Sequence, residues 1–277
     1  MVKYNILTQR EEEIINKKFK GISLTQNESN ILSKFVRPKL REISKIDANV
    51  LLNRLEYNQI SKSIENKIKK LILDNIKETK AILIYGSAIQ TNYKEYNDID
   101  ILIITNKKTW NSSGDKYDLI VKLTDLTKKE DLELDIQILD IYTFNHEYPH
   151  SPSLIYQLKD SKIIYGKMKM PTKVELSKLD LRMKLDWSDI DDENSKGGEI
   201  YQALRNVILV RLLLNKIINN NSLKEKVNRV LGDNIINKLK NNIASKSEKR
   251  VILEYIKNLA EQTDEEIKSA KWEKIAL

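Results

Sequence analysis

Two aspartates spaced two residues apart, Asp98 and Asp100, begin an apolar run that reads DIDILIIT. Side chains alternate along a strand, so both carboxylates project from one face while Ile99, Ile101 and Ile103 project from the other. Like charges this close repel each other unless water or a cation lies between them. A hard divalent ion such as Mg²⁺ is held by one or two carboxylates together with substrate phosphates. The pair therefore predicts a metal site at a strand end.

A third carboxylate is available in the segment 131–142, DLELDIQILDIY, which alternates like a strand. Its apolar face consists of Leu132, Leu134, Ile136 and Ile138, and its polar face of Glu133, Asp135 and Gln137. If this strand neighbours the first, Asp135 completes a set of three acids, with Glu133 as the alternative. Three carboxylates suit two metal ions about 3.5–4 Å apart, which clamp the attacking and leaving oxygens of a phosphoryl displacement.

A glycine–serine pair, Gly86 and Ser87, ends the preceding apolar run AILIY, and ten residues separate it from Asp98. Glycine lets the backbone approach a phosphate closely, and the serine offers a hydroxyl and an N–H at the start of a short helix, where an anion is favoured. The pair is therefore expected to hold the phosphates of a nucleotide.

This order of motifs resembles the nucleotidyltransferase superfamily that includes DNA polymerase β. It is most similar to minimal bacterial nucleotidyltransferases and to AbiEii-like and MenT-like toxin enzymes. The resemblance implies that Gly86 and Ser87 cradle the β and γ phosphates of an NTP, that Asp98 and Asp100 bind two Mg²⁺ ions, and that Asp135 binds the catalytic one. It also implies transfer of a nucleoside monophosphate to a hydroxyl acceptor with release of pyrophosphate.

The triphosphate also needs positive charge. Minimal members of the superfamily usually carry Arg-x-Arg-Gly after Gly-Ser, whereas this chain has AIQTNYKEYN at residues 88–97. Lys94 is therefore the expected contact, and Arg205, Arg211 and Lys216 on a long apolar helix are further candidates.

The acceptor is predicted to be a macromolecule, a tRNA or a protein, as in toxin-type members, and a cognate antitoxin is a possible partner. The chain has a net charge of +8, with basic residues in excess in residues 1–80 and 201–277 and acidic residues in excess in 81–200. Basic flanks favour tRNA. A small-molecule acceptor of the antibiotic type would instead need acidic residues such as those in WSDIDDEN, 187–194. A non-catalytic nucleotide-binding or partner-binding module is the other alternative.

Composition argues against several other kinds of site and protein. The chain has no cysteine, which removes disulfides, thiolate nucleophiles and cysteine zinc sites. No window is apolar enough for a membrane span, and acidic residues follow the amino terminus before a signal-peptide core could form. A cytoplasmic protein without membrane contact is expected.

The fold class predicted is α/β, or α+β, with a small mixed sheet. We expect an N-terminal helical region over 1–80, a nucleotidyltransferase core over 81–170 and a C-terminal helical bundle over 171–277. Capping boxes predict N-terminal helices that begin after Thr8 and after Thr25, the second ending before Pro38. Further helices are expected at about 47–58 and 61–78.

In the bundle, Thr172 and Glu175 predict another capping box, and the apolar segment 200–218 predicts a central helix. Shorter helices should follow, with Gly232 as a stop between two of them. The segment HEYPH, 146–150, matches the zinc-protease pattern HExxH, but its proline predicts a loop and no zinc site.

Overall fold

The computed structural model describes residues 6–44, 59–94, 96–171, 174–190 and 194–277. The chain divides into two compact units, Met1–Tyr57 and Asn58–Leu277. The helix predicted at 47–58 lies outside the described residues. No helix in the described ranges is both long and apolar enough to cross a bilayer.

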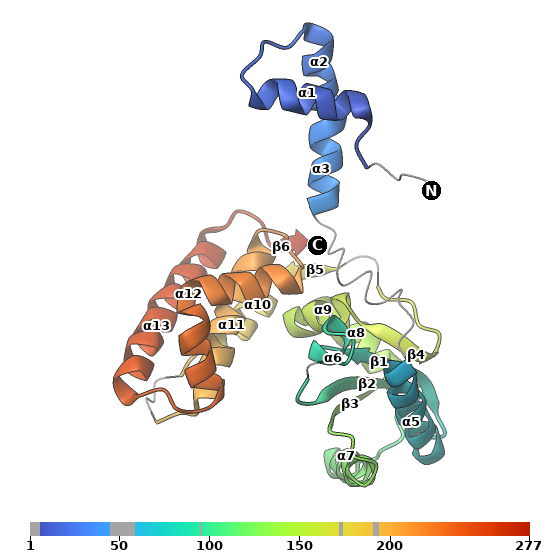
Figure 1. The fold of residues 1–277 in the computed structure, drawn as a ribbon. Helices are drawn as coiled ribbons and strands as arrows, with labels where there is room; N and C mark the ends of the chain where they lie inside the picture. Colours follow the sequence, from blue (N-terminus) through green and yellow to red (C-terminus); the bar gives the residue numbers. More distant parts are fainter. Residues whose placement is uncertain (1–5, 45–58, 95, 172–173, 191–193) are drawn as a thin grey trace. The chain divides into compact units, whose positions relative to one another are not determined.

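The first unit is helical: α1 (Gln9–Phe19), α2 (Gln26–Ile31), a π-helical segment (Leu32–Val36) and α3 (Arg37–Ser44) (Figure 1). The capping boxes predicted at Thr8 and Thr25 are both present. The predicted helix end before Pro38 is wrong. The π-helical turn lets the Arg37 N–H bond to the Leu32 carbonyl, and Pro38 then falls in the first turn of α3, where its missing N–H costs little.

The second unit contains a four-stranded mixed sheet in the order β3-β2-β1-β4. Its strands are β1 (Thr79–Tyr85), β2 (Ile99–Thr105), β3 (Leu134–Asp140) and β4 (Lys162–Gly166). Strand β1 is antiparallel to β2 and β4, whereas β2 and β3 are parallel. The prediction of a mixed α/β fold is confirmed.

Helices cover both faces of this sheet. Isoleucines of β1 and β2, such as Ile82 and Ile101, pack with Ile68 of α5 (Gln59–Asn75) and Leu123 of α7 (Ser113–Lys128). The opposite face packs against α8 (Ile141–Glu147), α9 (Pro152–Lys159) and residues of the C-terminal helices. Helix α5, which the sequence assigned to the N-terminal region, therefore belongs to the same unit as the sheet.

The remaining elements of the unit are α6 (Ser87–Gln90), a 3₁₀ turn (Tyr148–His150), β5 (Glu175–Ser177), α10 (Lys178–Asp186), α11 (Gly197–Leu214), α12 (Asn220–Lys240), α13 (Lys246–Ser269) and β6 (Lys274–Ala276). The predicted central helix corresponds to α11, most of whose side chains are buried. Gly232 interrupts α12 with a left-handed φ of 74°, as expected of a break.

Two local predictions in this region are wrong. Glu175 does not cap a helix: it pairs with Ala276 in a two-stranded sheet, and the helix begins after Ser177, whose reciprocal partner is Asp180. Thr172 lies outside the described residues. The HEYPH segment is also not a loop, because α8 runs to Glu147 and Pro149 is accommodated in the 3₁₀ turn that follows.

Candidate active site

The sheet register brings the predicted acids into one row. Tyr85 at the end of β1 lies opposite Asp100, and Asp100 lies opposite Asp135 on the parallel strand β3. Asp98 precedes β2 and is two residues from Asp100, so it belongs to the same side of the strand. Asp98 and Asp135 are exposed and Asp100 is half-buried. The structure thus gathers carboxylates from two adjacent strands at one edge of the sheet.

The glycine of the Gly-Ser turn lies directly against these acids. Gly86 has a φ of 74° and caps the short helix α6. A β-carbon built on Gly86 would lie 1.8 Å from Oδ2 of Asp100, so only glycine fits there. Ser87 is exposed at the first position of α6. The turn and the acids therefore form one continuous surface.

The acids act on one another electrostatically. Burial raises the pKa of Asp100 to about 6, and the negative charges of Asp98 and Asp135 add to the rise, while Arg205 opposes it. Burial and the same three carboxylates also raise the pKa of Tyr85. A half-buried acid surrounded by like charges is typical of a functional site.

Glu133, the alternative third acid, is placed differently. It is exposed and precedes the first residue of β3, and its backbone carbonyl accepts a hydrogen bond from the N–H of Ile99 at 2.9 Å. The residue that the parallel register places opposite Asp100 is Asp135. This geometry favours Asp135 as the partner of Asp100.

The donor chemistry fits a hard divalent cation. Among the described residues, no three His, Asp or Glu side chains are gathered tightly enough to form a metal site as they stand. The three aspartates nevertheless offer only oxygen donors, and a positive charge between them would offset the repulsion that they exert on Asp100.

The candidate basic residues differ in whether they lie near the acids. Arg205 of α11 is half-buried and close enough to act on both Asp100 and Lys184 of α10. Arg211 instead donates to Thr263 of α13 at 3.2 Å, which makes it a link within the bundle. Lys216 and Lys94 are both exposed, and no geometry in the structure ties Lys94 to the acids. Arg205 is therefore the basic residue that the fold directs to the acidic edge.

The buried carboxylate of Glu65, which no sequence pattern identified, anchors the loop before Asp98. Glu65 of α5, only 4% exposed, accepts a hydrogen bond from the Tyr93 hydroxyl at 3.1 Å and pairs with Lys162 of β4 at 2.6 Å. Tyr93 has a left-handed φ of 59° in the segment between α6 and β2. These contacts fix the connection between the Gly-Ser turn and the acids.

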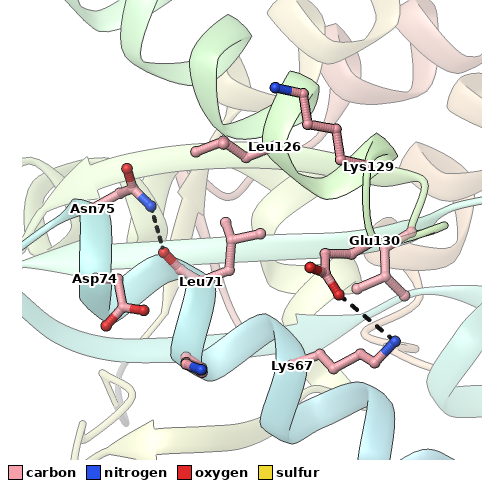
Figure 2. A pocket seen from close by; sticks show the side chains of 9 residues that line it. Lys67, Leu71, Asp74, Asn75, Leu126, Lys129 and Glu130 are labelled. Carbon is pink, nitrogen blue, oxygen red and sulfur yellow. Dashed lines mark hydrogen bonds and ion pairs between the residues drawn. The ribbon is translucent and has the colours of Figure 1, made fainter.

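A separate pocket lies between α5 and α7 (Figure 2). It has a volume of about 420 Å³, and its wall includes an ion pair between Lys67 and Glu130 at 3.9 Å. Because α5 and α7 cover the sheet face opposite to Asp100, this pocket contributes no group to the acidic edge.

Comparison with known families identifies the class of this part of the chain. Residues 66–170 match the family model described as polymerase beta, nucleotidyltransferase. The match includes the Gly-Ser turn, the three aspartates and the four strands. Residues 66–170 therefore form a nucleotidyltransferase domain of the polymerase β type. The chain thus contains a nucleotidyltransferase domain, as its sequence motifs predicted.

Solved structures show weaker likeness, and no curated protein sequence matches. A tri-AMPylated HEPN toxin in complex with MNT antitoxin from Shewanella oneidensis is 25% identical, with 39% of this chain and 73% of that chain covered and a TM-score of 0.27. A mutant of the toxin–antitoxin pair MntA–HpeT is also 25% identical, with 38% and 74% covered and a TM-score of 0.28.

A third similar structure is spectinomycin adenyltransferase AAD(9) from Enterococcus faecialis with ATP and spectinomycin. It is 17% identical, with 71% of this chain and 97% of that chain covered and a TM-score of 0.48. TM-scores this low support no conclusion about the acceptor of the present chain.

Proposed function

We propose that this protein transfers a nucleoside monophosphate from an NTP to a hydroxyl group of a macromolecule, with Mg²⁺ as the metal. The acceptor oxygen bonds to the α-phosphorus, the bond between that phosphorus and the bridging oxygen breaks, and pyrophosphate leaves. The observation that carries the proposal is the direct apposition of Gly86, Asp100 and Asp135 at one sheet edge.

Each residue has a role that follows from its position. Asp98, Asp100 and Asp135 would hold two Mg²⁺ ions, which neutralise the phosphates and polarise the reacting oxygens when they are bound. Gly86 gives the backbone room to approach the β and γ phosphates, and Ser87 donates to them. Asp135, exposed and opposite Asp100, is the candidate base for the acceptor hydroxyl.

Positive charge comes from the bundle. Arg205, half-buried on α11 and close enough to act on Asp100, is placed to pair with the triphosphate. Lys94, exposed in the loop before Asp98, would add a weaker and more solvated contact. The exposed surface around the acids gives a large acceptor access to the reacting phosphate.

The test is an incorporation assay. The full chain is incubated with each of the four labelled NTPs, Mg²⁺, total RNA and total protein, and both label uptake and pyrophosphate are measured. The Asp98→Ala and Asp100→Ala variants should lose at least a hundredfold in rate, because the charge-stabilising groups of such sites contribute at least that much. Asp125→Ala on α7 is the control, since its acid is exposed on the other side of the sheet.

Two results would overturn the proposal. One is normal transfer by the Asp98→Ala and Asp100→Ala variants. The other is NTP binding by the wild-type chain with no pyrophosphate release in the presence of any acceptor fraction, which would make the domain a nucleotide-binding module.

A further inference from the structure

A hollow of about 650 Å³ lies between α10 and the segment from α8 to α9, and we call it the α10 hollow. It is lined by His146, Glu147, His150, Ser151, Pro152, Ser153, Asp180, Met183, Lys184 and Trp187. Helix α10 presents Asp180, Met183 and Lys184, and its C-cap residue is Trp187; spacings of three, four and seven from Asp180 place these residues on one helical face. The volume is that of a typical ligand site.

An exposed aromatic ring forms one wall of the hollow. Trp187 is 76% exposed and Met183 is 56% exposed, an unusual exposure for side chains of this size. The Trp187 carbonyl accepts a hydrogen bond from Asn206 of α11 at 3.3 Å, which fixes the backbone below the ring. The indole is therefore a flat apolar surface on a fixed support.

Positive charge lies beside this ring. The Lys184 ammonium is 5.7 Å from the centre of the Trp187 ring, and Lys184 itself is half-buried. Within the described ranges Lys184 makes no ion pair. The nearby Asp180 is already satisfied, because it accepts from the Ser177 N–H at 2.7 Å and from the Ser177 hydroxyl at 2.8 Å and faces His150. Glu147 is exposed to water.

Arg205 connects the hollow to the acidic edge. It is close enough to Lys184 to disfavour its charge and close enough to Asp100 to stabilise the Asp100 carboxylate. The positive charges of Lys184 and Arg205 add to each other, which favours the approach of an anionic chain. A line of positive charge thus leads from the predicted site of transfer to the exposed indole.

We infer that the α10 hollow binds the end of a single-stranded nucleic acid, with a base stacked on Trp187 and a phosphate paired with Lys184. The inference rests on the proposed function and names its acceptor. An aromatic surface beside a cation is the usual arrangement for single-stranded nucleic acids, whose bases stack without regard to sequence. A polycationic small acceptor would be repelled by Lys184 and Arg205, and a protein hydroxyl would not need the indole.

Binding is measured without NTP, so that it does not depend on transfer. Fluorescence anisotropy with labelled single-stranded RNA and DNA oligonucleotides of the same sequence gives the Kd for each. Trp187→Ala should raise the Kd about tenfold or more, since stacking on one aromatic ring contributes that much. Lys184→Gln should reduce the slope of log K against log salt concentration by about 0.7, the value for one phosphate on a single strand.

Trp187→Ala and Lys184→Gln should change different measured quantities, the first the Kd alone and the second the salt dependence. Trp187→Ala should leave the salt slope unchanged, and Trp187→Phe should retain much of the affinity because a ring remains. Lys116→Gln is the matched control, since Lys116 also lies over a tryptophan, Trp110, at 5.3 Å but on the other side of the sheet. It should behave as the wild type. Circular dichroism melts establish that each variant is folded.

Unchanged Kd and slope in both Trp187→Ala and Lys184→Gln would overturn the inference, as would the absence of any oligonucleotide binding. In either case label transfer to protein would leave the proposed function intact. Loss of transfer to every acceptor, with oligonucleotide binding retained, would instead contradict the proposed function. Comparison of the RNA and DNA values identifies which strand the hollow accepts.

Discussion

Gly86 and Asp100 are so close that the glycine hydrogen faces the carboxylate where any other residue would place a carbon, 1.8 Å from Oδ2. The left-handed φ of 74° at Gly86 also favours glycine, because other residues rarely adopt it. The requirement for glycine is therefore double: the conformation and the space both exclude a side chain. This contact joins the turn that we propose to bind phosphate to the central acid of the candidate site.

Gly86→Ala should abolish transfer while the fold survives. The substitution strains the backbone by roughly 1–3 kcal/mol and displaces the Asp100 carboxylate. The matched control is Gly232→Ala, because Gly232 has the same φ of 74° but no atom within 4 Å of the added carbon. Both variants should lower the midpoint of urea unfolding, and only Gly86→Ala should stop incorporation of label. Equal activity in the two variants would contradict the role of the contact.

Arg205→Ala should raise the KM for the NTP. Hydrogen bonds to charged groups contribute about 1.5–3 kcal/mol, which corresponds to a rise of about 10- to 100-fold. Arg211→Ala, six residues further along the same helix, removes a bond to Thr263 instead. It should lower the free energy of unfolding without a change in KM. Steady-state kinetics together with urea unfolding separates the two effects, and a KM effect in Arg211→Ala alone would reverse the assignment.

Lys162→Met should destabilise the fold because it leaves the Glu65 carboxylate buried without a cation. Removal of one partner of a buried ion pair costs about 3–5 kcal/mol of unfolding free energy. Because Lys162 is partly exposed, we expect a loss near the lower end of that range. The double variant with Glu65→Gln should recover part of that loss. Urea unfolding of the two single variants and the double variant gives the coupling energy. A coupling near zero would show that the pair contributes nothing to stability.

Tyr93→Phe tests the same network at the loop. The hydroxyl bond to the buried Glu65 contributes about 1.5–3 kcal/mol if it behaves as a bond to a charged group. Because Tyr93 lies between the Gly-Ser turn and Asp98, we also expect a higher Mg²⁺ concentration for half-maximal transfer. Titration of the rate with Mg²⁺ measures this, and an unchanged midpoint would limit Tyr93 to a structural role.

Strong local signals made much of this arrangement predictable. Alternation in β3 and the two-residue spacing of Asp98 and Asp100 indicated the faces of the acids, and reciprocal capping indicated the helix starts after Thr8 and Thr25. The choice between Glu133 and Asp135 depended on the register of two strands separated by a helix, which no local pattern encodes.

The parts that could not be predicted depend on long-range packing. Glu65 is one charged residue on an ordinary amphipathic helix, and only the approach of β4 and the loop makes it buried. Arg205 could not be distinguished from Arg211 by sequence, because both are arginines on one apolar helix and their neighbours come from different elements. The helix predicted at Glu175 failed because pairing with residue 276 overrides its capping preference.

Lys184 should lower the free energy of unfolding near pH 7 and lower it less as the pH rises, and replacing Lys184 should remove this pH dependence. Burial, and then the positive charge of Arg205, lower the pKa of Lys184 from 10.5 to about 8. Below pH 8 both the folded and the unfolded chain carry the proton, so the folded state bears the full cost of the charge. Between pH 8 and 10.5 the unfolded chain binds more protons, so this cost disappears as the pH rises.

Lys184→Met should therefore be more stable than the wild type at pH 7, and the difference should shrink steadily toward pH 10. The other titratable groups that line the α10 hollow, His146, Glu147, His150 and Asp180, are the same in both proteins and cancel in the comparison. Lys159→Met removes an exposed lysine and measures the effect of net charge alone. Urea unfolding at a series of pH values gives the two curves. A constant difference across the range would show that Lys184 is solvated in the folded protein, and its place beside the indole would then carry no electrostatic cost.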